Sequence, residues 1–228
     1  MRPTRALGSA VRPPGSRWLS AVELGLGAAV VVGHNVFQRL PNEVPSLVAL
    51  GLLSLRLRDG GWAAMGLRRP ASWSRLLAIG AAAAVLRLAL GEYLIDPLTA
   101  RFWPPATAPS GVAEITGDPG YALAVLIFVW IFAAFGEEIV YRGYLLTRAA
   151  DLGRRSPAAY LAAVVATSIL FGVGHFYKGP AGMVDTGVAG LVLGGAYLLA
   201  GRNLWVSIVA HGLVDTVGIV LLLFGWDE

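Results

Sequence analysis

Long apolar runs constrain the fold of this chain more than any other feature. A helix that crosses the hydrocarbon core of a bilayer needs about 20 predominantly apolar residues. The sequence offers seven candidate segments, the second of them short, at residues 18–37, 44–57, 73–94, 121–147, 158–177, 183–200 and 203–225. Gly and Ala are frequent inside them, as is typical of helices that pack closely in lipid. We therefore predict an all-α integral membrane protein, a polytopic bundle of about seven transmembrane helices.

The composition excludes most soluble classes. Apolar residues make up 56% of the chain and charged residues 14%, whereas a soluble domain has about 45–50% and about 25%. Disordered chains are polar and rich in charge, so disorder is excluded on the same grounds. The chain has no cysteine, which excludes disulfides, thiolate metal sites and cysteine nucleophiles.

Lys and Arg are unevenly distributed over the connecting segments. Cytoplasmic loops of membrane proteins carry an excess of these residues. With the N-terminus in the cytoplasm, thirteen of the 18 Lys and Arg residues fall on the cytoplasmic side and three outside, while Arg87 and Arg142 lie within spans. The pattern predicts a cytoplasmic N-terminus and an outside C-terminus. It also assigns the net charge of +4 to topology and contact with anionic lipid, and not to a nucleic-acid partner.

The remaining organisation is simple. Residues 1–17, with four Arg and three Pro, predict a disordered basic cytoplasmic tail, and residues 18–228 a single transmembrane helical domain. The longest polar connection, residues 95–120, is expected to be an exposed loop that packs over the bundle. Arg outnumbers Lys 17 to one, and together with abundant Ala and Gly this indicates a GC-rich bacterial genome and the inner membrane of a bacterial cell.

Two adjacent carboxylates, Glu137 and Glu138, interrupt the fourth apolar segment. An ionisable group at membrane depth costs about 2.5–3.5 kcal/mol on insertion, so its presence suggests a function. Arg142 follows Glu138 by four residues and shares its helix face, whereas Glu137 points about 100° away and stays free. A free carboxylate can serve as a general base or acid. The alternative is an ion-pair network that locks helices together without chemistry.

Two further polar clusters lie in the last three apolar segments. His175 is surrounded by small residues that leave room for another group, or it is a hydrogen-bonded core or interface histidine. His211 and Asp215 share a helix face through their i, i+4 spacing. Asp215 could orient the imidazole, share a metal or donate a hydrogen bond if protonated; alternatively, the pair only ties helices together.

Together the three clusters predict a hydrolytic site in the core of a helical bundle, where such sites are built. In one arrangement Glu137 activates a water, His175 positions it, and His211 with Asp215 stabilises the developing oxyanion. In the other, His175, His211 and a carboxylate hold a zinc ion that leaves one position open for water.

The ordered motifs Glu-Glu-x-x-x-Arg (Glu137, Glu138, Arg142), Phe-x-x-x-His (Phe171, His175) and His-x-x-x-Asp (His211, Asp215) resemble the CPBP family of CAAX prenyl proteases and bacteriocin-processing proteins. The Gly66 to Pro70 stretch is also similar to bacterial members, and the resemblance covers about residues 62–225. It implies an intramembrane endopeptidase that hydrolyses peptide bonds of a membrane-associated protein or peptide.

The resemblance also implies roles for the residues. Glu137 is the implied general base, His175 helps to activate water, and His211 with Asp215 forms the oxyanion site, although eukaryotic prenyl proteases carry Asn at that last position. A glutamic-type mechanism that requires no cofactor is favoured. A zinc metalloprotease with Glu137, His175 and His211 as ligands is the alternative. Other functions left open are a non-hydrolytic ligand-binding or immunity protein and a hydrolase of lipid esters or amides. The sequence predicts no oligomeric state.

Other polar residues in apolar segments receive structural interpretations. We expect Arg87 to reach towards the membrane interface and Asp185 to cap its helix. Packing or lipid-interface roles are expected for Glu23, His34 and Asn35.

Overall fold

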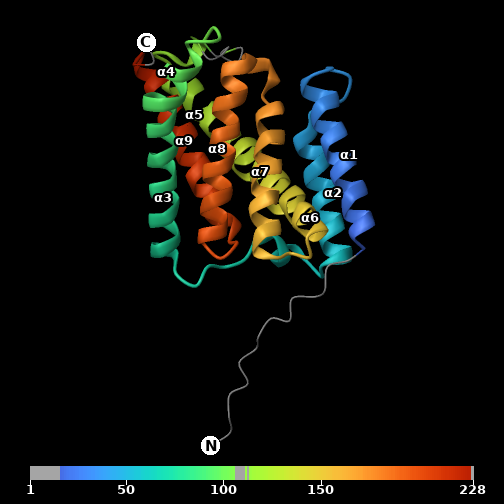
Figure 1. The fold of residues 1–228 in the computed structure, drawn as a ribbon. Coiled ribbons are helices and arrows are strands. Elements are labelled where there is room, and N and C mark those ends of the chain that lie inside the picture. The colour runs from blue at the N-terminus through green and yellow to red at the C-terminus, as the bar shows by residue number, and fades with distance from the viewer. Residues whose placement is uncertain (1–15, 106–110, 112, 227–228) are drawn as a thin grey trace, which may run out of the picture.

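The computed structural model describes residues 16–105, 111 and 113–226, which form an up-and-down bundle of helices without a strand (Figure 1). Most of the predicted basic tail, and part of the predicted loop at 95–120, lie outside these residues. The first half contains α1 (Arg17–Asn35), α2 (Glu43–Arg58), α3 (Trp73–Leu90) and the short α4 (Asp96–Thr99), which continues α3 through a π-helical turn at Gly91–Ile95.

One long helix runs through the second half of the fold. It comprises α5 (Pro119–Val129), π-helical segments at Trp130–Glu137 and Ile139–Leu145, and α6 (Leu146–Leu152). The π-helical turns fall around Glu137, and such turns are frequent at functional sites. The chain ends with α7 (Pro157–Val173), α8 (Gly179–Leu199) and α9 (Leu204–Phe224).

Short polar residues fix where the core helices begin. The side chains of Asp118, Ser156 and Asn203 accept hydrogen bonds from backbone N–H groups in the first turns of α5, α7 and α9. Pro119 and Pro157 follow two of these caps, at a position where the missing N–H costs nothing. The caps explain why the predicted and observed boundaries differ by few residues at these starts.

Every predicted apolar segment contains a helix, but the helices differ in their ability to span a bilayer. Among the described residues, four are long and apolar enough: Trp73–Thr99, Pro119–Leu152, Phe176–Leu199 and Leu204–Phe224. At about 1.5 Å per residue, the 17 residues of α7 extend about 25 Å, less than the hydrocarbon core of about 30 Å. The protein is a multi-pass membrane protein, and the number of seven spans stays a prediction.

Small residues bring α7 and α8 into close contact. A Cβ atom on Gly172 would lie 2.5 Å from the backbone carbonyl oxygen of Met183, and one on Gly190 would lie 2.8 Å from the side chain of Ser168. No larger residue fits at either place without moving a helix. The frequent glycines of the sequence therefore act as expected of membrane helices that pack at short distance.

The connections of the bundle separate into two ends. The turns at 59–72, 153–156 and 200–203 lie together with the start of α1 at the lower end of Figure 1, while those at 36–42 and 174–178 lie at the upper end with the end of α9. This alternation places the predicted cytoplasmic connections on one side.

A buried network of charges ties α1 and α2 to α6 at the lower end. We call it the base cluster; it comprises Glu23, Arg58, Asp59, Arg148, Asp151 and Arg155. Arg148 lies at its centre and donates to Glu23, Asp59 and Asp151 at 2.8–3.1 Å. Glu23 thus has a structural role, as the sequence suggested.

Candidate active site

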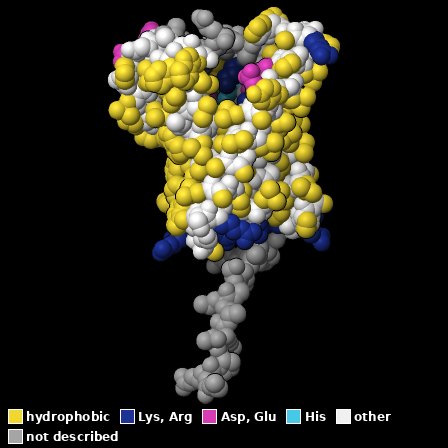
Figure 2. Space-filling model, turned by 90° about the vertical axis from the view of Figure 1, so that its left-hand side faces the viewer, with side chains coloured by type: hydrophobic (Ala, Val, Ile, Leu, Met, Phe, Trp, Pro, Cys, Tyr) yellow, Lys and Arg dark blue, Asp and Glu magenta, His cyan; other side chains and the backbone are white. Residues whose placement is uncertain are grey.

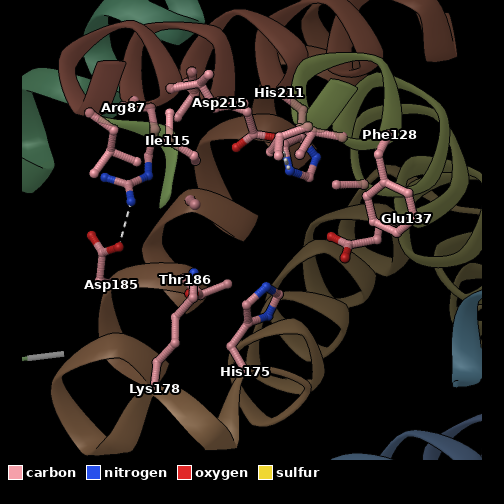
Figure 3. Close-up of a pocket in the computed structure, with 18 of the residues that line it drawn as sticks. Arg87, Ile115, Phe128, Glu137, His175, Lys178, Asp185, Thr186, His211 and Asp215 are labelled. Carbon is pink, nitrogen blue, oxygen red and sulfur yellow. Dashed lines mark hydrogen bonds and ion pairs between the residues drawn. The ribbon is translucent and has the colours of Figure 1, made fainter. Parts of the chain in front are cut away.

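A cavity of about 870 Å³ lies between α3, the long helix, α7, α8 and α9. Glu137, His175, His211 and Asp215 all line it, and their side chains surround one space in Figure 3. The long helix contributes the glutamate, the turn after α7 the first histidine, and α9 the last two residues. The structure therefore brings together four of the six predicted site residues in one cavity.

The other two predicted residues, Glu138 and Arg142, lie directly behind the cavity wall. Arg142 Nη1 donates to Glu138 Oε1 at 2.8 Å, as the i, i+4 spacing predicts. The same oxygen accepts a hydrogen bond from His211 Nδ1 at 2.8 Å. The side chains of Glu138 and Arg142 are almost fully buried. Glu138 therefore links Arg142 to His211 and fixes the orientation of that imidazole.

Glu137 stands apart from this pair, as predicted from the helix period. Its carboxylate points into the cavity towards His175 and His211 (Figure 3). The Oε2 atom is buried and has no hydrogen-bond partner within the described part of the chain. A carboxylate oxygen kept from other side chains in this way can accept a proton or a hydrogen bond from a bound molecule.

The tautomer of His175 follows from its backbone contact. Its Nδ1 lies 2.9 Å from the carbonyl oxygen of Phe171, and because a carbonyl only accepts, Nδ1 carries the proton. In the neutral ring Nε2 is then the accepting nitrogen. The Phe171 ring packs edge-on against His175 with centroids 4.8 Å apart, and it also contacts the Tyr141 ring and the Arg142 guanidinium, the latter 4.3 Å from the ring centroid. Phe171 thus explains the Phe-x-x-x-His spacing.

His211 lies between two carboxylates. Nδ1 contacts Glu138, and Nε2 lies 3.5 Å from Asp215 Oδ2. Asp215 Oδ2 is buried and makes no hydrogen bond to any residue that the structure describes. The geometry is consistent with the first role considered for Asp215, orientation of the imidazole.

The described residues do not form a ready metal site. No group of three or more His, Asp or Glu side chains among them is arranged to hold a metal ion. The alternative zinc ligands Glu137, His175 and His211 share the cavity without gathering around one point. We therefore derive no step through a metal.

Sequence reasoning missed a charged pair in the same cavity. Arg87 Nη2 donates to Asp185 Oδ2 at 2.5 Å, joining α3 to α8. The expected roles were wrong: Arg87 turns inwards, and Asp185 lies within α8 and does not cap it. Two opposite charges in separate apolar segments were the available signal. Tyr177, Lys178 and Thr186 also line the cavity and were not predicted.

The fold defines a multi-pass membrane protein with an acid–imidazole cavity between its helices. Residues 119–217 match the family model described as "Type II CAAX prenyl endopeptidase Rce1-like". The match contains every predicted site residue and confirms the resemblance to the CAAX protease family, which implies a membrane protease. Comparisons with curated proteins and with solved structures give no match.

Proposed function

We propose that the protein is an intramembrane endopeptidase in which Glu137 activates the attacking water. The observation that carries the proposal is the position of the Glu137 carboxylate, which faces the same cavity as His175 and has a buried oxygen without a partner among the described residues. All remaining site charges contact one another, so Glu137 is the carboxylate available for proton transfer.

The proposed reaction is a hydrolysis in two steps. Glu137 accepts a proton from water while the water oxygen bonds to the peptide carbonyl carbon, and His175 Nε2 accepts the second water hydrogen bond. The carbon–nitrogen bond then breaks, and Glu137 returns its proton to the leaving amine. Both protons and the electron pair of the broken bond are accounted for without a cofactor.

His211 supports the oxyanion in this proposal. In its protonated form the ring donates from Nδ1 to Glu138 and from Nε2 into the cavity beside Asp215. A donor fixed before the reaction stabilises charge that develops in the transition state at no cost in reorganisation. Glu138 and Arg142 act through His211 and are positioning residues.

The cavity suits an apolar, extended peptide. Much of its wall is apolar, including Phe128, Val129, Leu193 and Ile219. Its volume of about 870 Å³ lies in the usual range of ligand pockets, roughly 300–1,000 Å³. We infer that the substrate is a short segment of a membrane-associated peptide or protein.

We also propose a bacterial inner-membrane location with the N-terminus in the cytoplasm. The support is the distribution of Arg between the two ends of the bundle, because Lys and Arg near span ends set the orientation of membrane proteins.

Peptide cleavage by the detergent-purified protein tests the proposal. Glu137→Ala and His175→Ala are compared with the parent, and Glu92→Gln serves as a control because Glu92 is exposed and does not line the cavity. We expect the rate to fall by about 10²–10⁴-fold in the Glu137 variant and to be unchanged in the control. Parent-like cleavage in both cavity variants would eliminate the proposal. Mass spectrometry of the products separates peptide hydrolysis from lipid hydrolysis, and reversible binding without any product would favour a ligand-binding protein.

A further inference from the structure

The two ends of the bundle differ sharply in charge. Ten of the fifteen described Lys and Arg residues lie at the end that holds the base cluster: Arg17, Arg56, Arg58, Arg68, Arg69, Arg75, Arg148, Arg154, Arg155 and Arg202. Only three lie at the other end, Arg39, Arg101 and Lys178. Figure 2 shows Lys and Arg gathered around the lower end of the molecule.

Acidic residues show the opposite distribution. Three acids of the described chain lie at the lower end, Glu23, Asp59 and Asp151, and all three are paired with arginines of the base cluster. The upper end carries the acids Glu43, Glu92, Asp96, Glu114 and Asp118. Since Lys and Arg of short loops determine orientation, the lower end is the cytoplasmic one.

The cavity belongs to the upper half of the bundle. Its wall includes the connection between α4 and α5, through Gly111 and Ile115, and the turn between α7 and α8, through Tyr177 and Lys178. None of its lining residues comes from the turns of the lower end. In Figure 2 the surface is hollowed near the upper end, and basic side chains are visible inside the hollow.

The cavity ends near the middle of the bundle. Glu137 is 15 residues from the lower end of the long helix at Leu152, which is about 22 Å along the helix axis. Towards the lower end, buried apolar side chains of α3, α8 and α9 pack together, among them Leu76, Ala196 and Val206. A substrate that reaches Glu137 from the lower end would have to displace this packing.

We propose that the cavity opens towards the outer face of the membrane and takes its peptide from that side. The substrate is then an extracytoplasmic or outer-leaflet segment of a membrane-associated protein, and not a cytoplasmic tail. The sidedness rests on charge and on the position of the cavity. That the cavity cleaves the peptide it takes up rests on the proposed function.

Single-cysteine labelling tests the sidedness, and the chain suits it because the parent contains no cysteine. Glu114→Cys and Tyr177→Cys place thiols at exposed positions of the upper end, and Ala71→Cys places one at an exposed position of the lower end. Each variant is expressed in a bacterial host and treated with a membrane-impermeant maleimide in right-side-out and in inside-out vesicles. Labelling in detergent confirms that each thiol is reactive.

We expect the two upper thiols to react in right-side-out vesicles only, and Ala71→Cys in inside-out vesicles only. The reversed pattern, or equal labelling from both sides, would overturn the proposal. The same labelling is expected in a Glu137→Ala background, because orientation does not depend on catalysis.

A second readout separates the failure of this inference from the failure of the proposed function. A membrane peptide is added to right-side-out or to inside-out vesicles, and its cleavage is followed. We expect at least tenfold faster cleavage in right-side-out vesicles. The opposite preference would overturn the inference even if the enzyme is active. The expected labelling pattern with no cleavage on either side would support the proposed orientation of the cavity and contradict the proposed endopeptidase activity.

Discussion

Two groups of buried charges lie in this bundle, and they are built on different principles. In the base cluster three carboxylates meet three arginines, and none of its buried polar side-chain atoms is left without a hydrogen bond among the described residues. Around the cavity, by contrast, Glu137, Glu138, Arg142 and Asp215 each keep one buried atom without such a partner. Buried polar atoms are normally satisfied, so each exception calls for an explanation.

The difference teaches how to separate structural charges from functional ones. The base cluster satisfies all its buried donors and acceptors within the described chain, and its ion pairs fix α1 and α2 against α6. The cavity group uses only some of its hydrogen-bonding capacity internally, and two of its acids, Glu137 and Asp215, line a space that a molecule can enter. The sequence alone shows only apolar helices with charges in both regions.

Arg148→Met is expected to have the largest effect on stability. It removes the central donor of the base cluster and leaves Glu23, Asp59 and Asp151 without it. Breaking a buried ion pair by removing one partner costs about 3–5 kcal/mol. Unfolding in detergent measures the loss, and Arg56→Met is the control because Arg56 is exposed and forms no described ion pair. If the free energy of unfolding of Arg148→Met equals that of the control, the base cluster does not stabilise the fold.

Glu138→Gln should affect both stability and rate, because Glu138 is buried like the base cluster but contacts the cavity residue His211. A hydrogen bond to a charged group contributes about 1.5–3 kcal/mol, and we expect unfolding to become easier by that amount. The cleavage rate per folded molecule should fall at least tenfold because His211 Nδ1 then donates to a neutral amide oxygen, which holds the ring and its protonated form less strongly than a carboxylate. A loss of stability with an unchanged rate would assign Glu138 to structure alone.

Acid should weaken the base cluster in a defined way. Burial raises the pKa of Asp59, but the hydrogen bonds and charges of Arg155 and Arg148 outweigh it and lower the pKa below the ordinary value of 3.8. A lowered folded pKa means that the ion pairs contribute fully above the unfolded pKa and are lost as the pH falls through the folded one. The parent should therefore exceed Asp59→Asn in unfolding temperature at pH 7, with the difference closing below about pH 4.

The control for this titration is Glu114→Gln, since Glu114 is exposed and forms no described ion pair. It should follow the parent over the whole range. A difference between parent and Asp59→Asn that grows on acidification would contradict the account.

Asp215→Asn is expected to have the smallest effect. An amide oxygen can take the place of the carboxylate oxygen 3.5 Å from His211 Nε2. The amide N–H can also donate to an oxyanion, as the Asn of eukaryotic prenyl proteases is expected to do. We predict a change in kcat/KM of less than tenfold, or about 1.4 kcal/mol, whereas Asp215→Ala loses the contact with His211 and should lose more. Equal losses in both variants would show that the carboxylate charge itself is required.

Local spacing predicted the parts of the site that lie on one helix. The i, i+4 pairs Glu138–Arg142 and His211–Asp215, and the isolation of Glu137, all follow from the helix period and are present. The convergence of Glu137 with His175 was harder to predict. The long helix continues to Leu152, so Glu137 lies well above the lower end of the bundle. His175 follows the 17 residues of α7 and therefore reaches a similar distance from that end.

Contacts between distant segments were beyond the reach of spacing. The Arg87–Asp185 pair requires the register of α3 against α8, and the Glu138–His211 contact requires that of the long helix against α9. Neither register is encoded in the periodicity of one helix. The number of membrane spans could not be predicted from periodicity either, because helix α7 is regular and apolar but short.

The most direct test of the central claim is the single-turnover cleavage rate of Glu137→Gln, measured together with its free energy of unfolding. Gln keeps the shape of Glu but cannot accept the proton of water, and it removes a carboxylate that has a buried, unpartnered oxygen among the described residues. The account predicts a rate at least 100-fold below the parent with unfolding equal to or harder than the parent's. A parent-like rate, or a loss of rate that only follows a loss of folded protein, would contradict it.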